Sequence, residues 1–151
     1  MIKKLIFSSF LLFSSTVQAA RPLDMCDSGS WYEPASDGQG LSVEITRNLR
    51  YDRPDVIVYY YTYDSYGYPF WLVGIGNRRT NNSSEVHLQF HRFYGRFPPD
   101  FRYNDKSVDF PAGTGSFNSD GMFKWRPDTI LKNGGMADRN WRLEQLVSVC
   151  D

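Results

Sequence analysis

The chain has 151 residues, with 17 lysines and arginines against 17 aspartates and glutamates, and aromatic residues make up 17% of it. This length allows one domain of ordinary size. The balanced charge excludes a protein whose main partner is nucleic acid, because phosphate binding normally requires a strong basic excess. We therefore expect no nucleic-acid partner.

Residues 1–19 have the composition of a secretory signal peptide. Two lysines precede a short apolar stretch, and Val17 and Ala19 occupy the minus-three and minus-one positions of a cleavage site. The apolar stretch is too short and too rich in serine for a membrane span. We expect cleavage after Ala19, which leaves residues 20–151 as a single β domain without a membrane span, in the periplasm or secreted.

Two cysteines, Cys26 and Cys150, lie near the two ends of the predicted mature chain. In an exported protein such a pair indicates a disulfide, and the close C-x-x-C spacing of a redox or metal pair is absent. We expect a structural bridge that holds the ends of the domain within about 7 Å, Cα to Cα. In the chain-entropy model a loop of this length stabilises the fold by about 5 kcal/mol.

Short apolar or alternating runs separated by turn residues predict an all-β domain, since no long stretch has helical periodicity. Asp37-Gly38 and the sequence DSYG at 64–67 predict tight turns. We expect 128–138 to be a loop. The predicted strands in chain order are 28–33, 41–46, 56–63, 68–76, 85–93, 107–117, 122–127 and 140–149.

About eight strands with mostly short connections indicate a single antiparallel up-and-down, or meander, barrel of the avidin or lipocalin type. A β-sandwich is the alternative. The expected disulfide favours the barrel, because it would join the first strand to the last at the closing seam, and closure removes exposed sheet edges.

The stretch 59–76, YYYTYDSYGYPFWLVGIG, contains six tyrosines. On strand 56–63 alternate residues point to opposite faces, and both faces are bulky and uncharged. One face of strand 68–76 narrows to Gly74 and Gly76, which allows an aromatic ring to lie flat on the backbone or a ligand to approach.

These aromatic residues have two compatible interpretations. They fill the interior of a small barrel, or they form a small-molecule or glycan site at its mouth, where hydroxyl and indole N–H groups supply polar points on an apolar wall. The candidate ligand-binding residues are Tyr59, Tyr61, Tyr63, Trp71 and Trp31.

The long irregular segment after strand 85–93 mixes arginines with aromatic residues, which is the composition of protein-interaction hot spots. The alternative is a loop that folds over the barrel end and plugs the core. Arg78 and Arg79, in another loop, are expected to add a basic rim. The candidates for binding a protein partner are Arg96, Phe97, Phe101 and Arg102.

The sequence contains no motif that predicts catalysis, a metal or a cofactor. His87 and His91 lie about 13 Å apart on a straight strand, too far to share a metal ion. Glu33, Asp37 and Glu44 supply carboxylates near the first hairpin, as a glycosidase requires, although acidic residues are far commoner at turns and on solvated faces. We expect a protein that is not an enzyme.

The motifs GSWYEPASDGQG and YTYDSYGYPFWLVG resemble those of a family of small exported bacterial domains that is largely uncharacterised. The resemblance covers most of the mature chain, includes the final WRLEQLVSVC, and implies no catalytic residues. The family often has a cysteine near 117–123, which this chain lacks, so we expect a disulfide pairing that differs from that of such relatives. The matching positions are Gly29, Trp31, Tyr32, Pro34, Gly38, Gly40, Tyr61, Thr62, Tyr63, Asp64, Gly67, Pro69, Trp71, Leu72, Val73 and Gly74.

Three functional hypotheses follow. The first is an exported β-barrel module that binds a small molecule or an envelope glycan without catalysis. The second is a periplasmic inhibitor or immunity-type protein that binds an envelope protein. The third is an enzyme that acts on an envelope polymer, with Glu33, Asp37 or Glu44 as acid and base.

Overall fold

The computed structural model describes residues 20–46, 54–94 and 108–150. The predicted signal peptide and the partner-binding residues Arg96, Phe97, Phe101 and Arg102 lie outside these ranges. The described residues form two short helices and nine strands: η1 (Met25–Asp27), β1 (Gly29–Tyr32), β2 (Gly40–Ile45), β3 (Val56–Tyr63), β4 (Pro69–Gly76), β5 (Glu85–Tyr94), β6 (Val108–Asn118), β7 (Met122–Pro127), α1 (Thr129–Asn133), β8 (Arg139–Arg142) and β9 (Glu144–Ser148).

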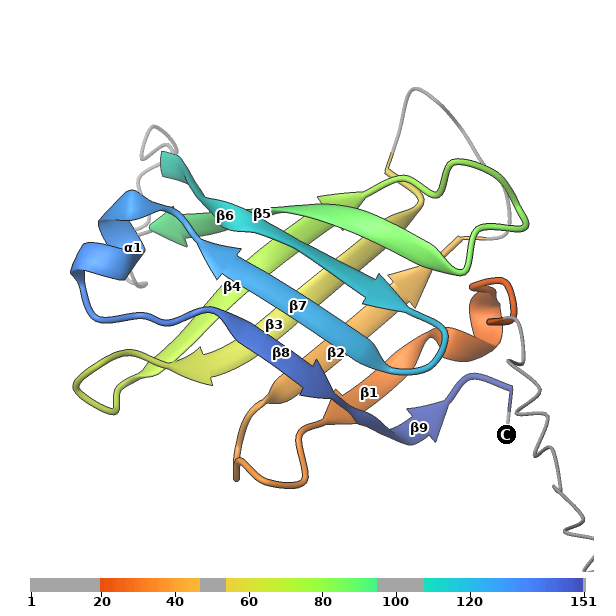
Figure 1. Ribbon diagram of the computed structural model, residues 1–151, viewed down its shortest axis with the longest axis horizontal. Helices are drawn as coiled ribbons and strands as arrows, with labels where there is room; N and C mark the ends of the chain where they lie inside the picture. Colours follow the sequence, from red (N-terminus) through yellow and green to blue (C-terminus); the bar gives the residue numbers. More distant parts are fainter. Residues whose placement is uncertain (1–19, 47–53, 95–107, 151) are drawn as a thin grey trace, which may run out of the picture.

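All these strands belong to one antiparallel sheet, in the order β8-β7-β6-β5-β4-β3-β2-β1-β9. Because β8 and β9 are consecutive in the chain, the two edges of the sheet meet and the sheet is nearly closed into a barrel. In Figure 1, β6, β7 and β8 cross in front of β2, β3 and β4, with the interior between them. The predicted all-β meander barrel is confirmed.

The predicted single strand 140–149 is wrong, because the structure divides this segment at Leu143. The part before Leu143 pairs with β7 and the part after it pairs with β1. At the division the backbone N–H of Leu143 donates to the carbonyl of Gly121, 2.8 Å away. One segment thus serves both edges of the sheet, and the described strands number nine instead of about eight.

The predicted loop 128–138 contains the helix α1. Asp128 caps it, with its side chain accepting a hydrogen bond from the backbone N–H of Leu131 at 2.9 Å. Leu131 packs against the core. A five-residue helix is too short to show apolar periodicity in a sequence. We call the end of the barrel that it covers the α1 end.

Alternation along the strands puts one side chain in every two into the barrel interior. Phe90 of β5 shows how tightly this space is filled. A Cβ atom on Gly74 would lie 2.6 Å from the Phe90 ring, and one on Gly115 would lie 2.9 Å from it. The expectation that the glycine face of β4 accommodates an aromatic ring is confirmed.

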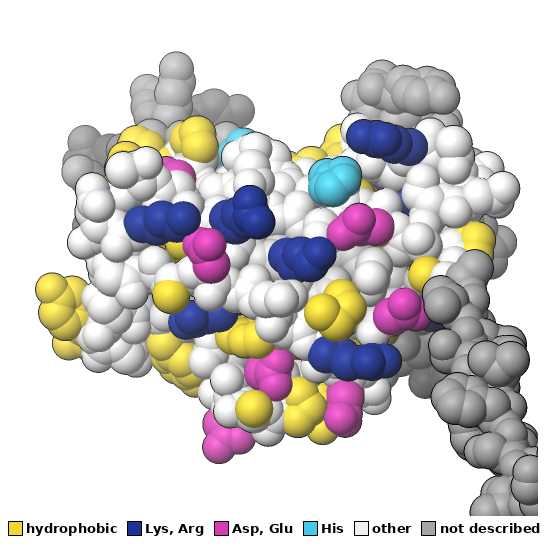
Figure 2. All heavy atoms as spheres, viewed as in Figure 1, with side chains coloured by type: hydrophobic (Ala, Val, Ile, Leu, Met, Phe, Trp, Pro, Cys, Tyr) yellow, Lys and Arg dark blue, Asp and Glu magenta, His cyan; other side chains and the backbone are white. Residues whose placement is uncertain are grey.

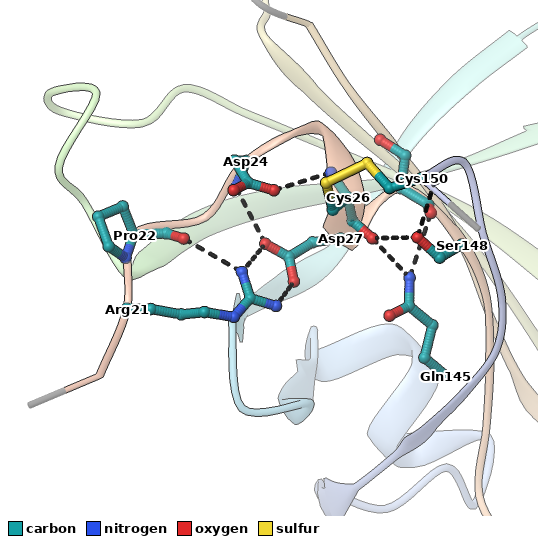
Figure 3. Close-up of a disulfide and its surroundings, with 9 residues drawn as sticks. Arg21, Pro22, Asp24, Cys26, Asp27, Gln145, Ser148 and Cys150 are labelled. Carbon is teal, nitrogen blue, oxygen red and sulfur yellow. Dashed lines mark hydrogen bonds and ion pairs between the residues drawn. A yellow bond between two sulfur atoms is a disulfide. The ribbon is translucent and has the colours of Figure 1, made fainter. Parts of the chain in front are cut away.

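The disulfide between Cys26 and Cys150 closes the opposite end of the barrel, with a Cα–Cα distance of 5.1 Å. Figure 3 shows side chains from β9 beside it. Gln145 Nε2 and Ser148 Oγ both donate to the backbone carbonyl of Cys26, at 2.8 and 2.9 Å. The predicted bridge is therefore confirmed, and hydrogen bonds support it from the same strand that closes the sheet.

An ion pair adds to this disulfide end. The fully buried Asp27 pairs with Arg21 and accepts from the backbone N–H of Asp24 (Figure 3). The hydrogen bond to Asp27 raises the pKa of Arg21 above its ordinary value.

Arg78 does not add to a basic rim, so that prediction is wrong. Its side chain is buried, with Nε 2.9 Å from the buried carboxylate of Asp55. The other guanidinium nitrogens donate to the carbonyls of Leu23 and Thr46, at 2.7 and 2.8 Å. Only Arg79 of the pair is exposed. Arg78 instead joins the N-terminal segment to two strand ends.

Among the described residues, neither helix is long or apolar enough to cross a membrane.

Candidate functional site

The side of β3 and β4 that faces away from the barrel interior is an unbroken surface of uncharged side chains. Tyr61 lies directly opposite Trp71 in the register of the two strands, and Tyr59 lies opposite Val73. We call this surface the outer aromatic face, which consists of Ile57, Tyr59, Tyr61, Tyr63, Pro69, Trp71, Val73 and Ile75.

The rings at the centre of this face are accessible. Trp71 exposes 48% of its surface, Tyr61 47% and Tyr63 39%, whereas Tyr59 is half-buried. Tyr61 stands on a part of β3 that is paired with β2 on one side and with β4 on the other, and Trp71 is its direct partner on β4. Four of the five predicted ligand-binding residues therefore lie together, on the outer wall of the barrel and not inside it.

The turn between β3 and β4 extends the aromatic surface. The carboxylate of Asp64 accepts from the backbone N–H groups of Tyr66 and Tyr68, each at 2.9 Å. Gly67 has a φ of +83°, which suits glycine and confirms the predicted turn. Tyr66 and Tyr68 are 85% and 68% exposed. The fixed turn holds two more tyrosines at the end of the outer aromatic face.

The first hairpin borders this surface on its β2 side. Gly38 has a φ of +73°, and a Cβ atom there would collide with the hydroxyl of Tyr63. In the sheet register Tyr32 lies opposite Gly40, and Gly40 lies opposite Tyr61. Across these three neighbouring strands, Gly40 therefore lies between Tyr32 and Tyr61.

The rest of the outer wall differs in charge. Figure 2 shows the side formed by β6, β7 and β8, over which basic and acidic side chains are spread. Lys124 and Arg126 of β7 and Arg142 of β8 are exposed there. The outer aromatic face is thus a distinct region of the surface, and exposed apolar patches of this kind commonly mark binding sites.

The interior contains a second set of aromatic residues, centred on Tyr60 of β3. The Tyr60 ring is fully buried and lies 5.1 to 6.4 Å, centroid to centroid, from the rings of Phe90, Phe123, Trp125 and Trp141. Edge-on arrangements of this kind stabilise a core beyond the area they bury. These residues constitute the core between the two walls of the barrel.

Three polar atoms in this interior have no hydrogen-bond partner within the described part of the chain. They are the hydroxyl of Tyr60, Nε1 of Trp125 and Nε of Arg139. An unpaired buried group costs roughly 1–3 kcal/mol. Burial raises the pKa of the Tyr60 hydroxyl, and the neighbouring Thr62 and Arg139 offset part of this rise. Both side chains are thus close to the hydroxyl, although neither reaches it with normal hydrogen-bond geometry.

Trp31, the fifth predicted ligand-binding residue, belongs to the core. It is 6% exposed, its ring packs edge-on against Phe117 at 5.1 Å, and its Nε1 donates to the carbonyl of Asp27 at 2.9 Å. The structure therefore separates it from the other four candidates.

The carboxylates considered for catalysis do not converge. Glu33 accepts from the backbone N–H of Ala35 at 3.0 Å within the first hairpin, where Asp37 is exposed. Glu44 is exposed near the opposite end of β2. The residues that the structure describes contain no cluster of three or more His, Cys, Asp or Glu side chains suited to a metal ion.

The sequence alone does not indicate the inward-facing polar groups on β7 and β8. Alternation along 122–127 does put Phe123 and Trp125 on one face, and the register pairs Trp125 with Arg139. Their convergence on Tyr60 depends on closure of the sheet, which no local pattern reveals.

No family model, curated protein or solved structure matches this chain. The resemblance to exported bacterial domains therefore stays a prediction.

Proposed function

We propose that this protein is an exported, non-enzymatic binding module whose outer aromatic face binds a neutral glycan. The observation that carries the proposal is the pairing of Tyr61 with Trp71, each about half exposed, at the centre of a face on which none of the eight side chains is charged.

The chemistry of the face matches that of a sugar ring. A pyranose presents an apolar C–H face and a rim of hydroxyl groups. Tyrosine and tryptophan have an apolar body and one polar group, so they stack on the first and form hydrogen bonds with the second. The absence of lysine and arginine among the eight side chains favours a neutral sugar over an acidic one.

The rigidity of the face supports binding. Tyr61 stands on a part of β3 that pairs with β2 and with β4, Trp71 is its direct partner on β4, and the Asp64 turn joins β3 to β4. Rings held in this way lose little conformational freedom when a ligand binds, which reduces the entropic cost of association.

The disulfide supports an oxidising compartment, since such bridges persist mainly outside the cytoplasm. The predicted signal peptide favours the periplasm or secretion, where envelope glycans are present. Binding of an envelope protein through Arg96, Phe97, Phe101 and Arg102 stays a prediction.

The test is isothermal titration of the mature protein with hexamers of β-1,4-linked N-acetylglucosamine and of β-1,4-linked glucose, with heparin as the acidic comparison. We expect one of the neutral hexamers to bind and heparin not to bind. Trp71→Ala and Tyr61→Ala should each weaken binding about tenfold, in line with the roughly 1–3 kcal/mol measured when a ring stacked on a nucleobase is removed.

Leu146→Ala is the matched control, because Leu146 is an exposed apolar residue, 62% accessible, on β9. It should leave binding unchanged. Failure of both neutral hexamers and of isolated cell-wall sacculi to bind would reject the proposal. Equal losses in the control and in Trp71→Ala would also reject it.

A further inference from the structure

The unpaired polar atoms in the barrel interior form one cluster. The rings of Tyr60 and Trp125 are 5.3 Å apart, and Trp125 and Arg139 are direct partners in the pairing of β7 with β8. Tyr60 and Trp125 are both fully buried. The three side chains come from opposite walls of the barrel and meet inside it.

A surface hollow opens at the α1 end of the barrel. It has a volume of about 310 Å³ and lies between α1, β5 and β6. This volume is at the lower limit for small-molecule sites. Its lining is mostly apolar, and the residues that form it are Arg92, Phe110, Pro111, Ala112, Asp128, Ile130 and Leu131.

Packed side chains of the inner face lie between the hollow and the polar cluster. The guanidinium of Arg92, which lines the hollow, lies 4.3 Å from the centroid of the Phe70 ring. Phe70 is the cross-strand partner of Thr62, which follows Tyr60 on the same face of β3. The carboxylate of Asp128, also in the lining, already accepts from the backbone of α1.

The chemistry of the cluster specifies what it can hold. The indole N–H and the guanidinium Nε–H are donors only, and the tyrosine hydroxyl can donate. One guanidinium adds one positive charge. A group that accepts several hydrogen bonds and carries one negative charge complements this set, and a carboxylate is such a group. The apolar lining of the hollow suits a hydrocarbon body.

We propose that the α1 end of the barrel binds a small amphiphilic carboxylate, whose oxygens accept from Tyr60, Trp125 and Arg139 and whose apolar part lies against Ala112 and Leu131. This site is separate from the outer aromatic face and uses none of its residues.

Three probes with the same tail test the head group: octanoate, octyl phosphate and 1-octanol. In calorimetry and tryptophan fluorescence we expect octanoate to bind one per chain and 1-octanol to bind at least about tenfold more weakly. Tighter binding of octyl phosphate than of octanoate would overturn the choice of a carboxylate. Absence of octanoate binding would overturn the site itself.

Two variants test the donors. Arg139→Gln should weaken octanoate binding about tenfold, whereas Arg142→Gln, an exposed arginine on the same strand, should not change it. Tyr60→Phe should weaken octanoate binding several-fold while stability is kept or increased, because it removes an unpaired buried hydroxyl. Unchanged affinity in both donor variants, with circular dichroism showing a native fold, would overturn the proposal.

Discussion

Strand β3 places tyrosines on both faces of the sheet, and the tyrosines on the two faces have different roles. Tyr60 is fully buried, and Tyr61, the next residue, exposes 47% of its surface. The inner tyrosine packs against four aromatic rings, whereas the outer one lies opposite an exposed tryptophan. Aromatic content alone therefore does not assign a role. The face on which a ring lies decides whether it stabilises the fold or is accessible to a ligand.

The largest expected effect sharpens this comparison. Tyr60→Ala should lower the free energy of unfolding by about 3–5 kcal/mol, as large aromatic truncations in cores do. Tyr61→Ala, one residue away, should change it by no more than about 0.5 kcal/mol, because the ring is half exposed. Urea unfolding of both variants measures the difference, and equal losses would refute the assignment of faces.

An intermediate effect concerns pH. Burial raises the pKa of Tyr60 above the ordinary value of 10.0. Below about pH 10 both folded and unfolded chains keep the proton, so stability is unaffected. Above it the unfolded chain ionises first, and the free energy of unfolding falls as the pH rises.

Tyr60→Phe should make this alkaline loss of stability smaller, as judged by urea unfolding between about pH 9 and pH 11. Tyr32 contributes in the same direction, because its hydrogen bond to Glu144 raises its pKa. The comparison is therefore made in a Tyr32→Phe background. An identical alkaline slope with and without the Tyr60 hydroxyl would contradict the buried environment of this residue.

The smallest expected effect is that of Trp71→Ala on stability, a change within about 0.5 kcal/mol. The same variant is expected to lose glycan binding, so stability and binding separate at this position. Thermal unfolding gives the first quantity. A loss of several kcal/mol would mean that Trp71 supports the fold, contrary to its 48% exposure.

Much of the fold could be predicted from the sequence, because local patterns indicate the strands and the turns. Alternation in 41–46 and 56–63 identified strands and divided their residues between two faces correctly, and Asp64 to Gly67 specified a turn. The positions of Cys26 and Cys150 indicated how the ends meet.

The remaining features depend on long-range contacts. Strand β3 is bulky on both faces, so alternation could not say that Tyr60 points inward and Tyr61 outward. From the sequence, Arg78 is expected to be an exposed loop arginine. Its buried partner, Asp55, lies 23 residues earlier in the chain, and no local pattern connects the two. The division of the last strand at Leu143 follows from closing the sheet, which is a property of the whole barrel.

The most direct test of the central claim uses the four tryptophan indole N–H signals in a ¹⁵N nuclear magnetic resonance spectrum. Trp71 lies on the outer aromatic face, Trp31 and Trp125 are buried in the core, and the Trp141 ring packs against Tyr60. On addition of the neutral hexamer that binds, the signal of Trp71 should shift while that of Trp125 stays in place. A shift of Trp125 with Trp71 unmoved would place the glycan inside the barrel and contradict the account.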